Sequence, residues 1–139
     1  NTIVANGRTP NVLQGLRQGE THGTLFVPDQ EPLLARKQWL AGHLKAKGEL
    51  YLDAGASKVL TQQGKSLLSV GVTKVSGDFT RGDMVLMLDP NHQVIARGLV
   101  NYSSPEAQKI LGFTSSAIES RLGFMAEPEL VHRDNLVLV

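Results

Sequence analysis

The chain has 139 residues, of which 41% are hydrophobic and 19% charged, and it contains no cysteine. This composition predicts one globular domain, or a small domain with a fragment of another, and it excludes disulfides and cysteine-based metal sites or nucleophiles. The formal net charge of +1 divides unequally: residues 1–47 carry six basic and three acidic residues, whereas residues 48–139 carry eight basic and ten acidic ones.

No stretch of the sequence approaches the length of a membrane span, and the first residues lack the basic-then-apolar pattern of a signal peptide. Together with the absence of cysteine, this predicts a soluble, cytoplasmic protein without a membrane partner. The first residue is Asn1 and not methionine, from which we expect a piece of a longer protein.

The N-terminal stretch has the pattern strand, helix, strand. Short apolar runs at residues 3–5 and 24–27 predict the strands. Thr9 as N-cap and Pro10 at the first helical position predict the start of the helix, and Gly19 is placed to end it. Elements this short cannot enclose a core, so we expect them to be poorly supported or to pack against a neighbouring copy.

Residues 29–47 are polar and contain proline, which predicts a linker. We expect one helix in it, over residues 32–41, with Trp39 and Leu40 as anchors on the following domain. The basic pair at positions 36 and 37 would suit a contact with another domain or a phosphate, but short charge clusters usually form a solvated helix face.

A compact domain begins near residue 48. Residues 49–52 alternate like a strand, and Asp53 is placed to cap a helix that carries apolar residues on one face. Gly64 is placed to end this helix, because a glycine just after the last helical residue accepts a left-handed conformation.

The next stretch, residues 64–88, is rich in glycine and has no room for a long helix. It predicts a short strand at residues 72–75 and turns at Gly77 and at Arg81-Gly82-Asp83. The unbroken apolar run at residues 84–88 is typical of a strand buried on both faces.

The remaining residues predict a hairpin partner, two small helices and a closing strand. Residues 94–102 are expected to pair with residues 84–88 across an Asp-Pro-Asn-His turn. One helix is predicted from Ser104 to Gly112, and Ser116 with Glu119 has the spacing of a capping box for a second helix, which Gly123 would end. Residues 136–139 form the last expected strand.

The spacing of glycines in the central stretch resembles the signature of the PUA domain, a module named for pseudouridine synthases and archaeosine transglycosylases. The matching residues are Gly64-x-Ser66-Leu67-Leu68-x-x-Gly71-Val72 and Val75-x-Gly77-x-Phe79-x-Arg81-Gly82-Asp83-x-Val85. With GLVNYSS at residues 98–104 and VHRDNLVL at residues 131–138, the chain is similar to the C-terminal part of bacterial glutamate 5-kinases. One departure is Ser69, where that family usually has proline, and we expect it to loosen one turn.

The resemblance implies a mixed α/β, mainly β fold, a small PUA-like pseudo-barrel with short flanking helices, preceded by a fragment of an α/β kinase domain. Residues 1–28 would be the end of the amino-acid kinase domain, residues 29–47 a linker with a short helix, and residues 48–139 the PUA domain.

The resemblance also implies the activity of the parent enzyme, the ATP- and Mg²⁺-dependent phosphorylation of the γ-carboxylate of glutamate in proline synthesis. The catalytic residues of the family lie upstream of this chain, so we expect no catalytic residue and no cofactor in it. The PUA domain would be an accessory part that regulates or assembles the kinase. The expected partners are the rest of the kinase chain and, in the parent enzyme, further copies of itself.

Three loop residues are candidate ligand contacts: Lys65, Ser66 and Arg81. Gly64-Lys65-Ser66 copies the end of a phosphate-binding loop, but Val59 stands where that motif needs a glycine, and the tripeptide ends a helix instead of opening one. A surface turn is therefore the favoured interpretation of Lys65.

Other chemical patterns are weaker. The four histidines are far apart in the sequence, so a metal site is not expected. His132-Arg133-Asp134 copies the catalytic loop of protein kinases without its companion motifs. We expect these residues to form a bend into the last strand, with Arg133 and Asp134 paired locally.

RNA is the alternative partner, because the PUA domain occurs in RNA-modifying enzymes. Phosphate neutralisation by basic residues supplies most of the affinity in such complexes. The acidic balance of residues 48–139 and the scarcity of aromatic residues for base stacking count against RNA binding.

Overall fold

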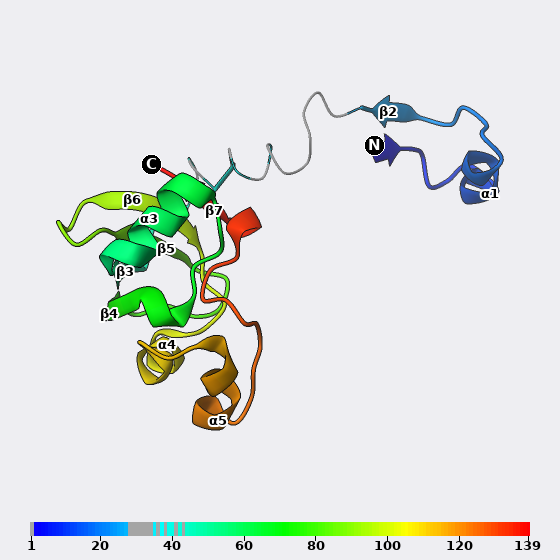
Figure 1. Cartoon of the computed structure of the whole chain (residues 1–139). Helices are drawn as coiled ribbons and strands as arrows, with labels where there is room; N and C mark the ends of the chain where they lie inside the picture. The colour runs from blue at the N-terminus through cyan, green and yellow to red at the C-terminus, as the bar shows by residue number, and fades with distance from the viewer. Residues whose placement is uncertain (1, 28–34, 36, 38, 41, 43) are drawn as a thin grey trace. The chain divides into compact units, whose positions relative to one another are not determined.

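The computed structural model describes residues 2–27, 35, 37, 39, 40, 42 and 44–139. The chain divides into two compact units, residues 1–34 and residues 35–139, and Figure 1 labels most of the helices and strands of each.

The first unit contains a two-stranded antiparallel sheet and one helix. Strand β1 (Thr2–Val4) pairs with β2 (Thr24–Phe26), so that Thr2 lies opposite Phe26. Helix α1 (Val12–Arg17) lies between them in the sequence. The predicted strand–helix–strand pattern is confirmed.

The predicted start of α1 is wrong. The carbonyl oxygen of Asn6 accepts a hydrogen bond from the backbone N–H of Thr9, and this turn takes up Thr9 and Pro10. The helix begins after Asn11, which has a left-handed backbone (φ 56°) that asparagine tolerates better than most residues. The predicted end is confirmed, since Gly19 follows the helix with a φ of +83°.

The first unit buries almost no apolar side chain. Gly15 is the one buried residue among those described in this unit. Several large apolar side chains are about half exposed or more: Ile3, Val4, Leu13, Leu25, Phe26 and Val27. Two-stranded ribbons of this kind are at best marginally stable in water. The prediction that this unit packs against something else stays a prediction.

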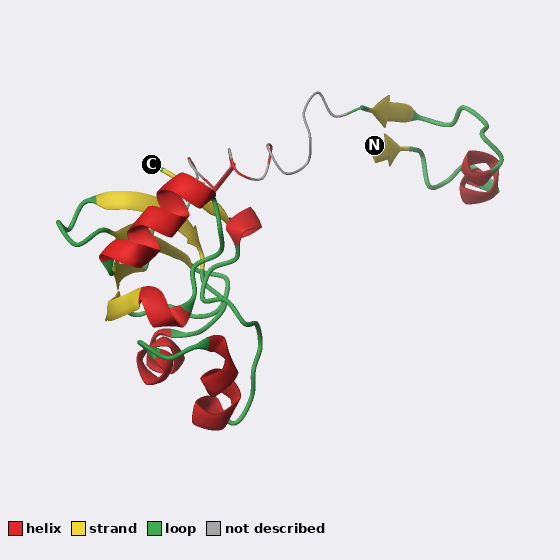
Figure 2. Ribbon diagram, viewed as in Figure 1, coloured by secondary structure: helices red, strands yellow, loops and turns green. Residues whose placement is uncertain are grey.

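The second unit is built on a five-stranded sheet in the order β4-β3-β5-β6-β7. Strands β3 and β5 are parallel, and every other neighbouring pair is antiparallel. Figure 2 shows the strands in yellow and the helices in red. The strands are β3 (Gly48–Leu52), β4 (Val72–Gly77), β5 (Met84–Leu88), β6 (Val94–Leu99) and β7 (Leu136–Leu138).

Helix α3 (Ala54–Gln63) confirms the predicted caps. The Oδ1 atom of Asp53 accepts a hydrogen bond from the backbone N–H of Ala56 at 2.7 Å. Gly64 ends the helix in the left-handed conformation, with a φ of 57°. A 3₁₀ turn, η1 (Ser69–Gly71), then leads into β4.

The central hairpin is also confirmed, with one correction at its end. Strand β5 is buried over most of its length, as its continuous apolar run predicts. Its partner β6 ends at Leu99 and not at Tyr102. Beyond this point the backbone leaves the ladder, because the N–H of Asn101 bonds to the carbonyl of Leu130 instead.

Two helices follow, α4 (Ser104–Ile110) and α5 (Ile118–Leu122), separated by the 3₁₀ turn η2 (Ser115–Ala117). Ser103 and Glu106 form a capping box on α4. The capping box predicted from Ser116 is wrong, because the Ser116 hydroxyl bonds to that of Thr114 and Ala117 precedes the helix. The predicted stops are confirmed: Gly112 and Gly123 both have positive φ angles.

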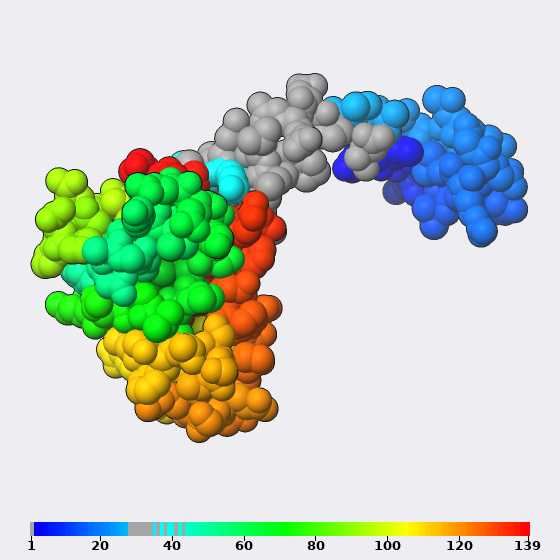
Figure 3. All heavy atoms as spheres, in the orientation of Figure 1, coloured from blue at the N-terminus to red at the C-terminus, as the bar shows by residue number. Residues whose placement is uncertain are grey.

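The bend into the last strand is a 3₁₀ turn, η3 (Arg133–Asn135), followed by β7. Arg133 and Asp134 lie 3.7 Å apart (Nε to Oδ1), as their predicted local pairing requires. In Figure 3 the α4–α5 region (yellow to orange) forms one end of this unit, and the C-terminal segment (orange to red) runs along its side.

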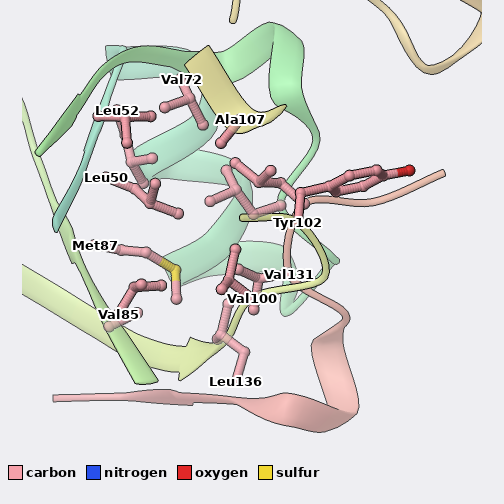
Figure 4. Packing of buried hydrophobic residues seen from close by; sticks show 14 of the residues in the cluster. Leu50, Leu52, Val72, Val85, Met87, Val100, Tyr102, Ala107, Val131 and Leu136 are labelled. Carbon is pink, nitrogen blue, oxygen red and sulfur yellow. The ribbon is translucent and has the colours of Figure 1, made fainter. Parts of the chain in front are cut away.

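One hydrophobic core holds the second unit together. Figure 4 shows Leu50, Met87 and Val131, which come from separate parts of the chain, directed toward one another. The ring of Tyr102 joins this cluster while its hydroxyl points away from it. Burial of such side chains stabilises the fold by roughly 1.5–3 kcal/mol each.

The predicted linker helix over residues 32–41 lies partly outside the described residues, as does Arg36. Residues 35, 37, 39, 40 and 42 are helical. Leu40 is fully buried, as its predicted anchoring role requires, but Trp39 is 46% exposed, so its predicted role as an anchor is wrong. The predicted boundaries of the linker stay predictions.

Candidate functional site

An apolar cavity lies between α3 and the loop that follows it. The cavity has a volume of about 230 Å³ and is lined from α3 by Ala56, Val59 and Leu60. From the loop and η1 it is lined by Lys65, Ser66, Leu67, Leu68, Val70 and Gly71. Two of the three predicted contact residues, Lys65 and Ser66, are therefore brought together at this site.

Backbone pairing and one glycine set the shape of this loop. The N–H of Leu67 donates to the carbonyl of Val131 at 2.8 Å, and the carbonyl of Leu67 accepts from the N–H of Leu130 at 2.8 Å. At the other end, a Cβ atom on Gly71 would lie 2.5 Å from the Cβ of Ala56. Glycine at this position therefore lets the loop close against α3.

The rim of the cavity is apolar, with one cation. Leu68 and Val70 are 40% and 45% exposed, although both are large aliphatic residues. Lys65 is exposed beside them. This arrangement would accept an apolar group that carries a negative charge at one end.

Ser66 has a structural partner. Its Oγ accepts a hydrogen bond from the backbone N–H of Arg133 at 3.0 Å, which ties the loop to η3. Histidine, aspartate and glutamate are absent from the residues that line the cavity, so the lining offers Ser66 no side chain to act as a general base. The lining therefore offers contacts for a ligand but no acid–base pair that would activate Ser66.

Arg81 is not among the residues that line the cavity. Its Nη2 atom lies 3.3 Å from Oε1 of Glu127, in an exposed ion pair. The Arg81-Gly82-Asp83 turn is present as predicted, with Gly82 at a φ of +88°. The structure therefore does not join Arg81 to Lys65 and Ser66 in one site.

The carboxylate of Asp83 organises the same turn. It accepts hydrogen bonds from the backbone N–H of Thr80 at 2.8 Å and from its hydroxyl at 2.9 Å. Its other oxygen lies 2.9 Å from Nζ of Lys47. The hydrogen bond from the Thr80 backbone, followed by those from Lys47 and the Thr80 hydroxyl, lowers the pKa of Asp83 to about 2.

A second polar cluster surrounds Tyr51, and sequence reasoning did not find it. The Tyr51 hydroxyl donates to Oε2 of Glu49 at 2.7 Å, and this bond is the main reason that the pKa of Tyr51 is raised. Nζ of Lys74 lies 5.0 Å from the centre of the Tyr51 ring, and the His92 ring meets it edge-on at 5.3 Å. The alternation of polar and apolar residues in β3 indicates that Tyr51 faces away from the core, but it does not indicate which side chains surround it.

The described residues contain no group of three or more His, Asp or Glu side chains that could hold a metal ion. Within the same part of the chain, no helix is both long and apolar enough to cross a membrane.

The PUA domain family model matches residues 48–122, more than half of the chain. The chain belongs to the PUA domain family. The predicted fold, a mixed α/β and mainly β PUA domain with short helices, is confirmed. The cavity between α3 and its following loop lies within the matched PUA domain.

Curated relatives match almost the whole length of the chain. The glutamate 5-kinase of Thioalkalivibrio sulfidiphilus is 58% identical over 138 residues, which are 99% of this chain and 37% of that protein. The glutamate 5-kinase of Chromohalobacter salexigens is 59% identical over 138 residues, 99% of this chain and 36% of that protein. The predicted similarity to glutamate 5-kinases is confirmed, and the chain spans little more than a third of the length of these relatives.

Solved structures are similar to part of this chain. A PUA domain of Aeropyrum pernix K1, crystallised as a tartrate complex, is 27% identical and has a TM-score of 0.48, covering 63% of this chain and 41% of that one. A chain of the archaeal box H/ACA sRNP Nop10–Cbf5 complex is 21% identical with a TM-score of 0.42, covering 66% and 25%. Because both TM-scores are below 0.5, the assignment of the chain to the PUA domain family rests on the family model alone.

Proposed function

We propose that this chain is the C-terminal accessory part of a glutamate 5-kinase. The parent enzyme would transfer the γ-phosphoryl group of ATP to the side-chain carboxylate of glutamate, with Mg²⁺ bound to the nucleotide. The observation that carries the proposal is the identity of 58% over 138 residues to a glutamate 5-kinase. Residues 1–28 would then be the end of the kinase domain, and residues 48–139 the PUA domain.

The role of this part would be regulation or assembly, and not catalysis. The lining of the cavity in the PUA domain supports this, because it offers one cation and an apolar rim but no acid–base pair. We further propose that the parent enzyme is a cytoplasmic homo-oligomer. The absence of cysteine supports the compartment, since disulfide-free chains suit a reducing environment.

The activity is tested on the full-length protein that carries this chain. Transfer of phosphate to a carboxylate makes an acyl phosphate, which hydroxylamine converts to a hydroxamate that can be measured by its ferric complex. ATP-dependent hydroxamate formation with glutamate, and not with aspartate, is the expected result. Absence of this product with every carboxylate tried would refute the proposed activity.

The accessory role is tested by removal of residues 35–139, which form one compact unit. We expect the shortened enzyme to keep glutamate phosphorylation while its affinity for substrates, its inhibition by products or its number of subunits, measured by native mass, changes. Equal kinetics, regulation and subunit number with and without this unit would refute the accessory role. A change in subunit number alone would reduce that role to assembly.

A further inference from the structure

Residues 44–47, the strap, precede the first strand of the PUA domain and lie against its sheet. Near the middle of β6, Nη2 of Arg97 donates a hydrogen bond to the carbonyl oxygen of Leu44 at 2.5 Å. Arg97 lies opposite Leu86 of β5 and Val137 of β7, so the strap is attached within the sheet and not at its rim. Just upstream, Leu40 is fully buried.

The other end of the strap is fixed at Lys47. Its backbone N–H donates to the carbonyl of Met84 at 2.8 Å, and its Nζ lies 2.9 Å from Oδ1 of Asp83. Because the other oxygen of that carboxylate is bound by Thr80, the ion pair joins the strap to a turn whose geometry is already set.

A glycine lets the strap lie close to the sheet. A Cβ atom on Gly77 would lie 2.5 Å from the carbonyl oxygen of Lys47 and 2.6 Å from the Cα of Gly48. Gly77 also has a φ of +90°, which side chains rarely allow. Side-chain and backbone contacts thus hold both ends of the strap, at Leu44 and at Lys47.

We propose that the strap, clasped by Arg97 and Asp83, is a fixed extension of the PUA domain and is the element through which that domain acts on the rest of the enzyme. The attachment of the strap is inferred from its contacts with Arg97, Met84 and Asp83. Its regulatory role rests on the proposed function. A ligand or partner that shifts β5 or β6 would move Leu44 and Lys47 with the sheet, and would thereby displace the segment that leads into the PUA domain.

Hydrogen exchange in the full-length protein tests the attachment of the strap, because the Lys47 amide is itself a donor in the clasp. Arg97→Met removes the guanidinium but keeps an apolar stem. The amide of Lys47 is expected to exchange on the order of tenfold faster in this variant, while β3 and β5 keep their protection. Lys109→Met, an exposed residue of α4, is the matched control and is expected to leave the exchange of the Lys47 amide unchanged.

Lys47→Gln is a second test of the attachment, because it removes the ion pair with Asp83. The Lys47 side chain is exposed, so the substitution carries little risk of misfolding. It is expected to increase exchange at the amide of residue 47, with a smaller increase in 1 M salt, because salt already screens the ion pair. Unchanged exchange of this amide in both variants would overturn the proposal. Equal loss of protection at this amide and over β3 and β5 would also overturn it, since the strap would then not be a separate element.

Enzyme kinetics test the regulatory role. If removal of residues 35–139 changes the kinetics of the full-length enzyme, Arg97→Met is expected to produce at least a threefold change in the same direction, and Lys109→Met none. Wild-type kinetics in Arg97→Met would overturn the regulatory role. A full-length protein without glutamate phosphorylation would refute the proposed function, while the exchange result would still decide the strap.

Discussion

The hydroxyl of Ser69 donates a hydrogen bond of 2.8 Å to the carbonyl oxygen of Phe113, a residue 44 positions later in the sequence. Ser69 is fully buried in η1, and its own carbonyl accepts from the N–H of Gly112 at 3.0 Å. From the sequence, serine at this position was expected only to loosen a turn, and the contact with Phe113 was not predicted. It links the cavity loop directly to the end of α4.

Ser69→Ala is therefore expected to destabilise the protein by about 1–2 kcal/mol, because the carbonyl of Phe113 loses a buried donor. Urea denaturation followed by circular dichroism measures the change. Ser116→Ala is the matched control, since its hydroxyl bonds to Thr114 at the surface, and it is expected to change stability by less than about 0.5 kcal/mol. Equal stability of the two variants would contradict a structural role for Ser69.

The two tyrosines give a second matched pair. The Tyr102 hydroxyl donates to the carbonyl of Glu127 and accepts from its N–H at 3.0 Å, and the Tyr102 residue is fully buried. Tyr102→Phe leaves two backbone groups without this partner and is expected to cost about 1–3 kcal/mol of stability. Tyr51→Phe removes a partly exposed bond to Glu49 and is expected to cost less than about 1 kcal/mol. Thermal unfolding of both variants under one condition checks the order, and the reverse order would refute it.

Asp83 predicts a pH dependence of stability. Its pKa is lowered from 3.8 to about 2 in the folded protein, so its ionised form stabilises the fold above pH 3.8. That contribution is lost as the pH falls from 3.8 toward 2. The melting temperature of the wild type is expected to fall more steeply between these pH values than that of Asp83→Asn. Glu119→Gln, on exposed α5, is expected to follow the wild type, and parallel curves for all three proteins would contradict the assignment.

RNA binding is expected to be weak or absent. Residues 48–139 carry eight basic against ten acidic residues, and this balance disfavours the release of many counterions from a phosphate backbone. A titration with a transfer RNA at low and at physiological salt measures this directly. Binding in the micromolar range that weakens steeply with salt would refute the expectation, and loss of that binding in Lys65→Glu but not in Arg81→Glu would place the RNA at the cavity.

Local signals in the sequence predicted the elements whose ends are set locally. Helix α3 is correct at both ends because the Asp53 cap and the Gly64 stop act within four residues of the positions they define. The start of α5 is wrong because a distant contact competes: the Ser115 hydroxyl donates to the carbonyl of Pro128 at 2.6 Å and holds residues 115–117 in a separate turn.

The candidate site was predictable only as a loop. Glycine spacing identified the segment that carries Lys65 and Ser66, because positions with a left-handed backbone or a close backbone contact usually require glycine. The partner of Ser66 is 67 residues away and the partner of Arg81 is 46 residues away. Such pairings depend on the tertiary arrangement of the strands and loops, and the periodicity of the sequence does not predict them.

The order of strands also has a consequence for how the protein reaches its fold. Parallel pairing places Gly48 of β3 opposite Val85 of β5, and the last strand places Leu136 opposite Gly98. Contacts so distant in sequence slow folding, because the chain loses the entropy of closing long loops before the strand pairs contribute favourable free energy. During synthesis the edge of β6 that pairs with β7 therefore stays unpaired until Leu138 has left the ribosome. In that interval the exposed backbone groups of β6 can pair with a strand of another chain.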